Sequence, residues 1–321
     1  MTRSFSFDHF SCRCAGIALA TLALHGGLAG ATELGGSSYP VGVELGYGDM
    51  LPPGFYNLAY YSHAQASSLK GNSGQDLGWA RYRLTADTIS YRMQYVWKTT
   101  LLGAGAESTL VFPFPAIDLE KRVAGNLPDT SGTRFRMTDP LIVPLRLAWK
   151  GAHLNQSAAV EIVAPLGDYD VNARVNSGRN YWQFAPAYAL SYRPTDASSF
   201  GLKLRYGMNT RNKATNYSSG EEFSAEYIAG YKLSASVTLG LQGYFLRQTT
   251  DDELNGQPTS AANGRLIGSG IGNRGSANAA GPFLSYRVSP RFAITGKYQQ
   301  EFGVKNRGEF SRFWLQVLLP F

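Results

Sequence analysis

The chain ends with the stretch SRFWLQVLLPF, residues 311–321. Read in steps of two, it places five large apolar residues on one face: Phe313, Leu315, Val317, Leu319 and Phe321. The opposite face carries Arg312, Trp314, Gln316, Leu318 and Pro320. This alternation predicts a strand whose two faces meet different environments. Because an uncovered apolar strand aggregates, something apolar must lie against the first face.

The start of the chain has the pattern of a secretory signal peptide. The apolar run AGIALATLAL, residues 15–24, follows Arg3 and Arg13 and precedes an A-x-A site that ends at Ala31. Its length of about 10 residues is half of the roughly 20 that a membrane-spanning helix needs. We therefore expect residues 1–31 to be cleaved, which also removes both cysteines.

The composition of the remaining chain excludes several classes of protein. Without cysteine, an exported protein has no disulfide framework and no thiolate metal site. The net charge of +7 is modest for 321 residues and no basic block occurs, so we expect no nucleic-acid partner. Acidic residues in the predicted loops, such as Asp168 and Asp251, lack the spacing of a cation-binding loop, so we expect no metal and no cofactor.

The rest of the sequence consists of long stretches with period-two alternation. They are separated by clusters of Gly, Asn, Asp, Pro and Ser. We identify twelve, which begin at Gly54, Leu84, Ala106, Thr138, Leu154, Tyr181, Phe200, Glu221, Ser236, Ala280, Arg291 and Ser311. Soluble strands typically have about five or six residues, whereas a tilted membrane-spanning strand needs about nine to eleven. The predicted strands have the membrane-spanning length.

The predicted connections alternate between long and short. The long ones cover residues 71–83, 115–137, 167–180, 210–220 and 249–279, and the last, 303–309, is brief. A soluble sandwich shares the strand alternation, but long loops on one side with tight turns on the other are typical of an outer-membrane barrel. Inside lipid a free strand edge has no water to bond, so the sheet must close. The sequence predicts an all-β fold: a closed, transmembrane, antiparallel up-and-down β-barrel of about twelve strands over residues 54–321, with both ends in the periplasm.

Two further features of the strands lead to predictions. Prolines interrupt four of the runs, at Pro144, Pro165, Pro186 and Pro282, where each removes a ladder donor. We expect bulges or bends there, and hypothesise that these open gaps in the wall. Aromatic residues gather near strand ends and predict interfacial girdles: Tyr60, Tyr61, Trp97, Trp149, Tyr181, Trp182, Tyr192, Tyr244 and Trp314.

The polar faces of the strands point into the lumen in such a barrel. They carry charges of both signs, and the selectivity candidates are Arg92, Arg146, Glu161, Lys203, Arg205, Glu226, Lys297 and Glu301. One interpretation is an ion-pair network that fills and rigidifies the barrel. The alternative is that these residues select what passes.

Residues 32–53 precede the first strand and are rich in Gly and Pro. This segment is long enough to fold into the lumen as a plug, with Tyr39, Leu45, Met50 and Leu51 as contacts. A disordered periplasmic leader has the same composition, so both interpretations stay open.

Catalysis finds little support in the sequence. Ser62 and His63 are neighbours in one predicted strand, so their side chains point to opposite faces and cannot form a nucleophile–base pair. A lipid-facing His63 keeps open a lipid-modifying enzyme as an alternative, but we predict no catalytic residues and no enzyme.

Several stretches resemble a known outer-membrane family. They include SSYPVGVELGYGDMLPPGFY, LLGAGAESTLVFPFP, TDPLIVPLRLAWK, NSGRNYWQFAPAYALSYRP and GLQGYFLRQTTDDELNG, in this order along the chain. Together they are similar to the outer-membrane protein family named for the meta pathway of phenol degradation. The resemblance implies an outer-membrane barrel of transporter type, associated with aromatic or hydrophobic compounds. It carries over no functional residues.

The expected function is therefore passive uptake of small hydrophobic or aromatic compounds across a Gram-negative outer membrane. A surface barrel without transport, which binds partners through its long loops, is the alternative. The expected partners are outer-membrane lipid, the solute and the outer-membrane insertion machinery. The insertion machinery would recognise the terminal signal: Phe313, Leu315, Val317, Leu319 and Phe321.

Overall fold

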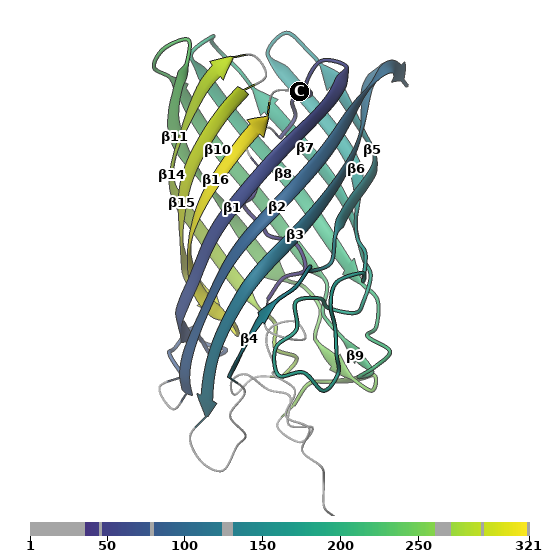
Figure 1. Cartoon of the computed structure of the whole chain (residues 1–321), viewed down its shortest axis with the longest axis vertical. Coiled ribbons are helices and arrows are strands. Elements are labelled where there is room, and N and C mark those ends of the chain that lie inside the picture. The colour runs from purple at the N-terminus through teal and green to yellow at the C-terminus, as the bar shows by residue number, and fades with distance from the viewer. Residues whose placement is uncertain are drawn as a thin grey trace, which may run out of the picture.

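The computed structural model describes residues 36–44, 47–77, 80–123, 131–260, 271–289 and 292–319. The predicted signal peptide, residues 1–31, lies outside these ranges. Within the described residues, no helix is long and apolar enough to cross a membrane. The strands form a tall barrel, with the C-terminal strand beside the first one (Figure 1).

Twelve antiparallel strands make the wall of the barrel. They are β1 (Gly54–Leu69), β2 (Ala80–Leu101), β3 (Ala104–Val123), β5 (Leu141–Lys150), β6 (Leu154–Val163), β7 (Gln183–Tyr192), β8 (Ser198–Asn209), β10 (Glu222–Lys232), β11 (Val237–Gln248), β14 (Ser276–Ser289), β15 (Phe292–Lys305) and β16 (Gly308–Leu319). The sheet order is β2-β1-β16-β15-β14-β11-β10-β8-β7-β6-β5-β3, and a pairing between β2 and β3 closes it. The predicted closed up-and-down barrel is confirmed.

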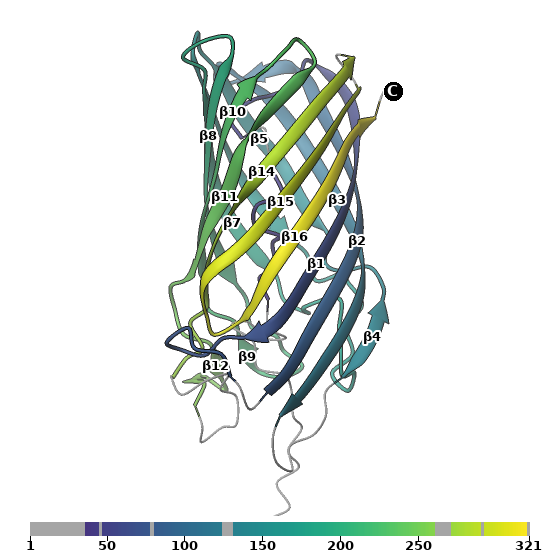
Figure 2. The same ribbon diagram turned by 90° about the vertical axis from the view of Figure 1, so that its left-hand side faces the viewer.

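The first and last strands seal the barrel. In the β1–β16 ladder Asn57 pairs with Leu319 and Tyr61 with Leu315. Side chains of β16 alternate between the two sides of the wall: Phe313 is 42% exposed, whereas Trp314 is 4% exposed. Figure 2 shows β16 between β15 and β1. Phe321 lies outside the described residues.

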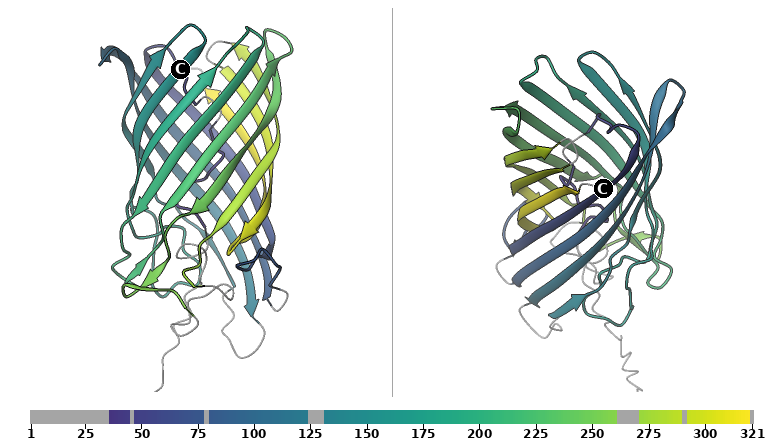
Figure 3. Two further views of the ribbon diagram at one scale, coloured as in Figure 1. Left: turned by 180° about the vertical axis from the view of Figure 1, so that it is seen from behind. Right: turned by 45° about the horizontal axis from the view of Figure 1, so that its top comes forward.

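The two ends of the barrel differ in their connections. At one end, called the turn end, adjacent strands join through short turns, such as Leu102–Gly103 between β2 and β3. Both residues have positive φ, 51° and 72°, as in a two-residue type I′ hairpin. At the other end, called the loop end, the connections are long, except between β15 and β16. Figure 3 shows the coil before β1 running within the ring of strands.

Several predicted boundaries were wrong at the loop end. The sequence predicts a loop from residue 115, but β3 continues to Val123 and pairs with β2 throughout most of its length. A short strand, β4 (Gly132–Phe135), adds to the edge of β3. The loops also hold a small sheet of β9 (Tyr217–Ser218), β12 (Glu253–Leu254) and β13 (Gln257–Pro258).

The aromatic girdle prediction was wrong for four of its residues. Tyr61, Trp97, Trp149, Trp182 and Tyr192 are exposed, whereas Tyr60, Tyr181, Tyr244 and Trp314 are buried. Whether an aromatic residue near a strand end faces outward or inward thus depends on its odd or even position along the strand, because alternate side chains face opposite sides of the wall.

The four prolines have different environments. Pro144 lies where the pairing of β5 shifts register against both β3 and β6, so the predicted bulge occurs there. Pro186 and Pro282 pair on one side only, and their ladders to β8 and β15 skip the position. Pro165 follows the end of β6, so its placement in a strand was wrong.

Candidate functional site

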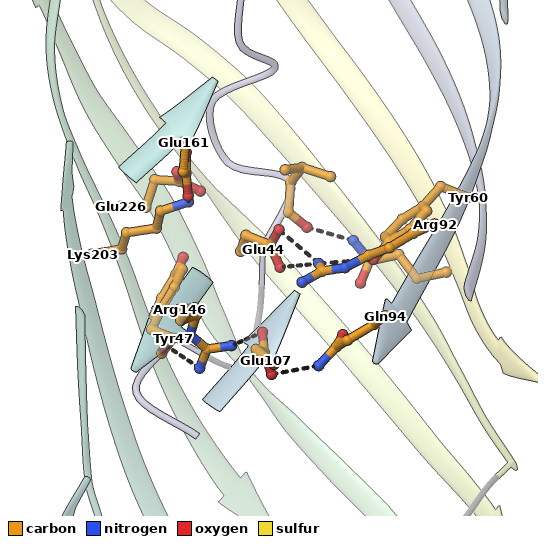
Figure 4. A network of polar contacts seen from close by, with 12 residues as sticks. Glu44, Tyr47, Tyr60, Arg92, Gln94, Glu107, Arg146, Glu161, Lys203 and Glu226 are labelled. Atoms are coloured by element: carbon orange, nitrogen blue, oxygen red, sulfur yellow. Dashed lines mark hydrogen bonds and ion pairs between the residues drawn. The ribbon is translucent and has the colours of Figure 1, made fainter. Parts of the chain in front are cut away.

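The interior of the barrel is polar and densely paired. All eight predicted lumen residues lie inside it: Arg92, Arg146, Glu161, Lys203, Arg205, Glu226, Lys297 and Glu301. Figure 4 shows several of them converging from different strands. Their role in selectivity stays a prediction, but their partners are now defined.

Charge pairs connect neighbouring strands on the inner face of the wall. Arg146 of β5 donates to Glu107 of β3 at 2.6 Å, and Glu107 also accepts a bond of 2.7 Å from Gln94 of β2. Glu107 is 1% exposed, so this carboxylate depends on both donors. Removing one partner of such a buried pair typically costs about 3–5 kcal/mol because it leaves an uncompensated charge.

A second group of charges centres on Glu161 of β6. This carboxylate accepts bonds from Lys203 at 2.7 Å and from Arg205 at 2.8 Å. Arg205 also donates to Gln183 of β7 at 2.6 Å. One carboxylate therefore pairs with two cations. The group keeps a net positive charge, which favours another electron-rich partner.

The segment before β1 supplies that partner. The hydroxyl of Tyr39 accepts a bond of 2.9 Å from Lys203, and the Arg205 guanidinium carbon lies 4.3 Å from the centre of the Tyr39 ring. Tyr39 is 1% exposed. Glu44 of the same segment accepts a bond of 2.9 Å from Arg92 of β2.

The turn at Gly42 and Val43 is held through its backbone. The N–H of Gly42 donates to Glu226 at 2.9 Å, and its carbonyl accepts bonds from Lys297 at 2.5 Å and Gln299 at 2.9 Å. Lys297 also donates to the carbonyl of Val43 at 2.6 Å. Gly42 has φ +84°, a conformation that favours glycine. Side chains of β10 and β15 thus bind the main chain of this turn.

Residues 47–53 fill the turn end of the barrel. Arg146 donates to the carbonyls of Tyr47 and Asp49. The carboxylate of Asp49 accepts a bond of 2.7 Å from Arg193. The Met50 sulfur lies against Gly105, where a Cβ would be 2.8 Å away.

The predicted plug contacts therefore have separate outcomes. Tyr39 and Met50 contact the wall, Leu51 is half-buried, and Leu45 lies outside the described residues.

The loop-end half of the lumen is hollow. A cavity of about 310 Å³ lies above the turn at Gly42, which is the size of a small-molecule site. Its walls come from β16, β1, β2 and β3, its floor from residues 36–44, and part of its roof from the β6–β7 loop.

Small side chains on the wall create this space. Residues at one height of the wall can be followed from β16 through β1 and β2 to β3 by their pairing. One row reads Phe310, Ala66, Leu84, Leu119; the next reads Arg312, Ala64, Ala86, Ile117; the third reads Trp314, Ser62, Thr88, Pro115. The middle of every row has a small residue on β1, whereas large residues stand at the edges. All twelve residues line the cavity, except Ala66.

The ladder between β3 and β5 is interrupted beside the cavity, and this gap in the hydrogen-bond ladder is called the opening. Their ladder ends at the Val111–Leu141 pair, and β3 gains a new partner, β4, only at Ala116. Pro113 and Pro115 occupy the interval, where the carbonyl of Pro113 accepts a bond of 3.0 Å from the N–H of Thr138. Alternate residues of a strand direct their backbone groups to the same side, so both prolines face the opening.

These prolines make the opening compatible with lipid. An unpaired N–H in hydrocarbon costs several kcal/mol, and proline has none. Residues Pro113, Pro115 and Thr138 line the cavity, so the opening in the ladder borders the cavity. The exposed Phe114 stands beside it.

Comparison with known proteins agrees with this architecture. Residues 66–317 match the family described as "Putative MetA-pathway of phenol degradation". The chain belongs to this family. No curated protein is detectably similar in sequence.

The fold of this chain is similar to that of a solved outer-membrane channel. The COG4313 outer membrane channel from Pseudomonas putida F1 is 17% identical, with a TM-score of 0.72 over 87% of this chain and 100% of that one. This likeness shows a shared fold. The KdgM porin, 9% identical, covers 82% of this chain and 99% of its own at a TM-score of 0.41. A FadL homologue from Pseudomonas aeruginosa, also 9% identical, covers 82% and 89% at 0.40. Both are too distant to bear on function.

Two carboxylates anchor the loops at the mouth of the barrel. Asp139 accepts backbone N–H bonds from Gly167 at 2.9 Å and Arg179 at 2.7 Å, and burial raises its pKa. Asp252 accepts bonds from Tyr217, Gln248 and the Gly220 N–H, and burial raises its pKa well above the usual carboxyl range. The loops are therefore fixed to one another.

His63 lies on the outer face of β1, opposite the buried Ser62. Its Nδ1 is 2.9 Å from Asp87 of β2, whose carboxylate also accepts a bond from Tyr61. Among the described residues, no serine hydroxyl is hydrogen-bonded to the imidazole. The described residues also hold no group of three or more metal-ligating side chains.

The sequence prediction missed the residues that define the cavity. The alternation of the last strand places Arg312 on its inward face, but neither Arg312 nor Phe310 was predicted as a site residue. The alanines of the cavity wall and Pro113 and Pro115 were missed as well. The signal available for this region was an arginine on the inward face of the last strand.

Proposed function

We propose that the protein is a passive outer-membrane channel that takes up small hydrophobic or aromatic compounds. The observation that carries this proposal is the cavity, whose wall is mainly apolar and which borders the interrupted part of the β3–β5 ladder. Membership of a family described by phenol degradation supports the class of solute. The loop end would face the outside and the turn end the periplasm.

The route of the solute follows from the positions of the cavity and of the occupied part of the lumen. A solute enters between the loops and occupies the cavity. Residues 36–44 and 47–53 and the charge pairs occupy the path toward the turn end, so an apolar solute gains most by leaving sideways past Pro113 and Pro115 into the membrane. The ion pairs then hold the segment in place, and selectivity by the eight lumen residues is a secondary role. Recognition of the closing strand by the insertion machinery remains part of this proposal.

The test is uptake by cells at a limiting concentration of a phenolic compound. A strain that lacks the protein is complemented with wild type, with Ala86→Trp or with Ala229→Trp. Ala86 faces the cavity, whereas Ala229 is exposed on the outer face of β10, away from the cavity and from the β3–β5 edge. We expect Ala86→Trp to reduce uptake to the level of the deletion strain and Ala229→Trp to behave as wild type.

Uptake that does not depend on the protein at all would favour a surface barrel without transport. Uptake that survives Ala86→Trp would show that the solute does not use the cavity. Assembly of each variant is checked by its amount in the outer membrane.

A further inference from the structure

The cavity contains an arginine without a carboxylate partner. Arg312 of β16 is half-buried, and among the described residues it donates one hydrogen bond, a long one of 3.4 Å to the carbonyl of Val41. No acidic side chain in the described part of the chain lies within ion-pair distance of it. A guanidinium removed from bulk water without an anion is costly, so this position favours a negatively charged ligand.

The other charges of the cavity do not neutralise Arg312. Glu44 is paired with Arg92, and both oxygens of Asp139 accept backbone N–H groups of the loop. Arg307 is paired with Glu301 at 3.3 Å. Arg174 and Arg179 also line the cavity, so its lining is positive on balance.

The surroundings of Arg312 are apolar and leave room on one side. The guanidinium carbon lies 6.0 Å from the Phe310 ring centre and 5.6 Å from the Trp314 ring centre. Its row on the wall continues through Ala64 and Ala86 to Ile117. The guanidinium therefore stands at one end of a row of apolar side chains on the wall, and the opening beside Pro115 lies near the other end of this row.

We propose that the cavity binds organic carboxylates with an aromatic or apolar body. The carboxylate bonds to Arg312, and the body lies over Ala64 and Ala86 toward β3. This inference rests on the proposed function, because it names the solute class of the same channel. It goes beyond that function by preferring anions to neutral compounds of equal shape. Arg recognises a carboxylate through paired, charge-assisted hydrogen bonds, which a neutral amide cannot match.

The experiment compares two probes of nearly equal shape, 3-phenylpropanoate and 3-phenylpropanamide, by calorimetric titration of the full chain in nanodiscs at neutral pH. We expect wild type to bind the carboxylate about tenfold or more tighter than the amide, the scale of a charge-assisted hydrogen bond. Arg312→Gln should bind both equally, with the amide affinity unchanged. Arg312→Lys should keep part of the preference. The control Arg81→Gln, an exposed arginine of β2 outside the cavity, should keep all of it.

Three results would overturn the inference: equal affinities in wild type, no binding of either probe, or an undiminished preference in Arg312→Gln. If Arg312→Gln binds neither probe, Arg312→Lys decides, because equal affinities there would also overturn it. Each of these results leaves the proposed function standing if Ala86→Trp still blocks uptake. Uptake that is insensitive to Ala86→Trp contradicts the proposed function instead.

Discussion

Gly42 is the single residue on which the lumen segment depends most. Its φ of +84° disfavours any side chain, and a Cβ there would lie 2.4 Å from Gln299 and 2.7 Å from Tyr244. We expect Gly42→Ala to displace the turn at a cost of about 1–3 kcal/mol, because strain and collision act together. The measurable result is a higher single-channel conductance in planar bilayers.

Gly103→Ala is the matched control for Gly42. Gly103 also has positive φ, +72°, but nothing lies within 4 Å of its Cβ position in the β2–β3 turn. The Gly103→Ala variant should be slightly less stable than wild type and should have the same conductance. Equal conductance of wild type and Gly42→Ala would show that the turn does not restrict the path.

Asp252 should make the mouth of the barrel sensitive to pH. Burial raises its pKa above that of an unfolded carboxyl, so the folded loops bind the proton more tightly than the open loops do. Lowering the pH through the raised pKa should therefore stabilise the loops, and the gain is complete below the unfolded carboxyl pKa near 4. Hydrogen exchange at the Gly220 N–H, corrected for its intrinsic rate, should slow as the pH falls below neutral.

Asp252→Asn provides the control for this pH effect. It removes the titrating group, so the dependence should disappear while exchange elsewhere in the barrel is unaltered. A dependence that persists in Asp252→Asn would assign the effect to another group.

The strands differ in how well their sequences predict them. In β7 and β16, alternation and flanking turn residues decide both extent and facing, because one side meets lipid and the other the lumen. β3 was cut short because Pro113 and Pro115 look like a strand end. They are tolerated since β3 pairs with β2 alone at that height.

The candidate site was predictable only in part for a related reason. Strand parity correctly places the eight charged residues inside, but which of them meet depends on the stagger of strands around the barrel. The Arg146–Glu107 pair and the position of Arg312 beside Ala64 follow from that stagger. Alanines such as Ala64 and Ala86 carry no signal of their own, so the cavity was not visible in the sequence.

The two prolines of β3, Pro113 and Pro115, should decide whether the β3–β5 ladder stays interrupted. Replacing both Pro113 and Pro115 by Thr restores two N–H groups at an edge that faces lipid, where they gain by bonding to the β5 side. We expect the double variant to extend the β3–β5 ladder and to reduce uptake of apolar solutes, with the ionic conductance unchanged. Pro186→Thr in β7, away from the cavity, is the control and should leave uptake intact. Normal uptake by the double variant would argue against a lateral exit.

At the scale of the whole molecule, the lumen has two halves with different contents. The loop-end half is a cavity with an apolar wall, and the turn-end half is occupied by residues 36–44 and 47–53 together with charge pairs. Two acidic residues of this segment, Glu44 and Asp49, neutralise Arg92 and Arg193 of the wall. The segment therefore contributes both bulk and negative charge to the interior.

Deleting residues 36–52 separates these contributions. The variant should conduct ions much better than wild type and should prefer anions, because Arg92 and Arg193 lose their carboxylates and face the opened path. The reversal potential in a KCl gradient measures this preference. Glu44→Gln combined with Asp49→Asn is the control: it removes the charge but keeps the bulk, so its conductance should stay low. If the deletion variant conducts no better than wild type, the wall charges alone close the turn end. If it conducts well but prefers cations, Glu107, Glu161 and Glu226 dominate the emptied lumen, and the segment acts by its bulk alone.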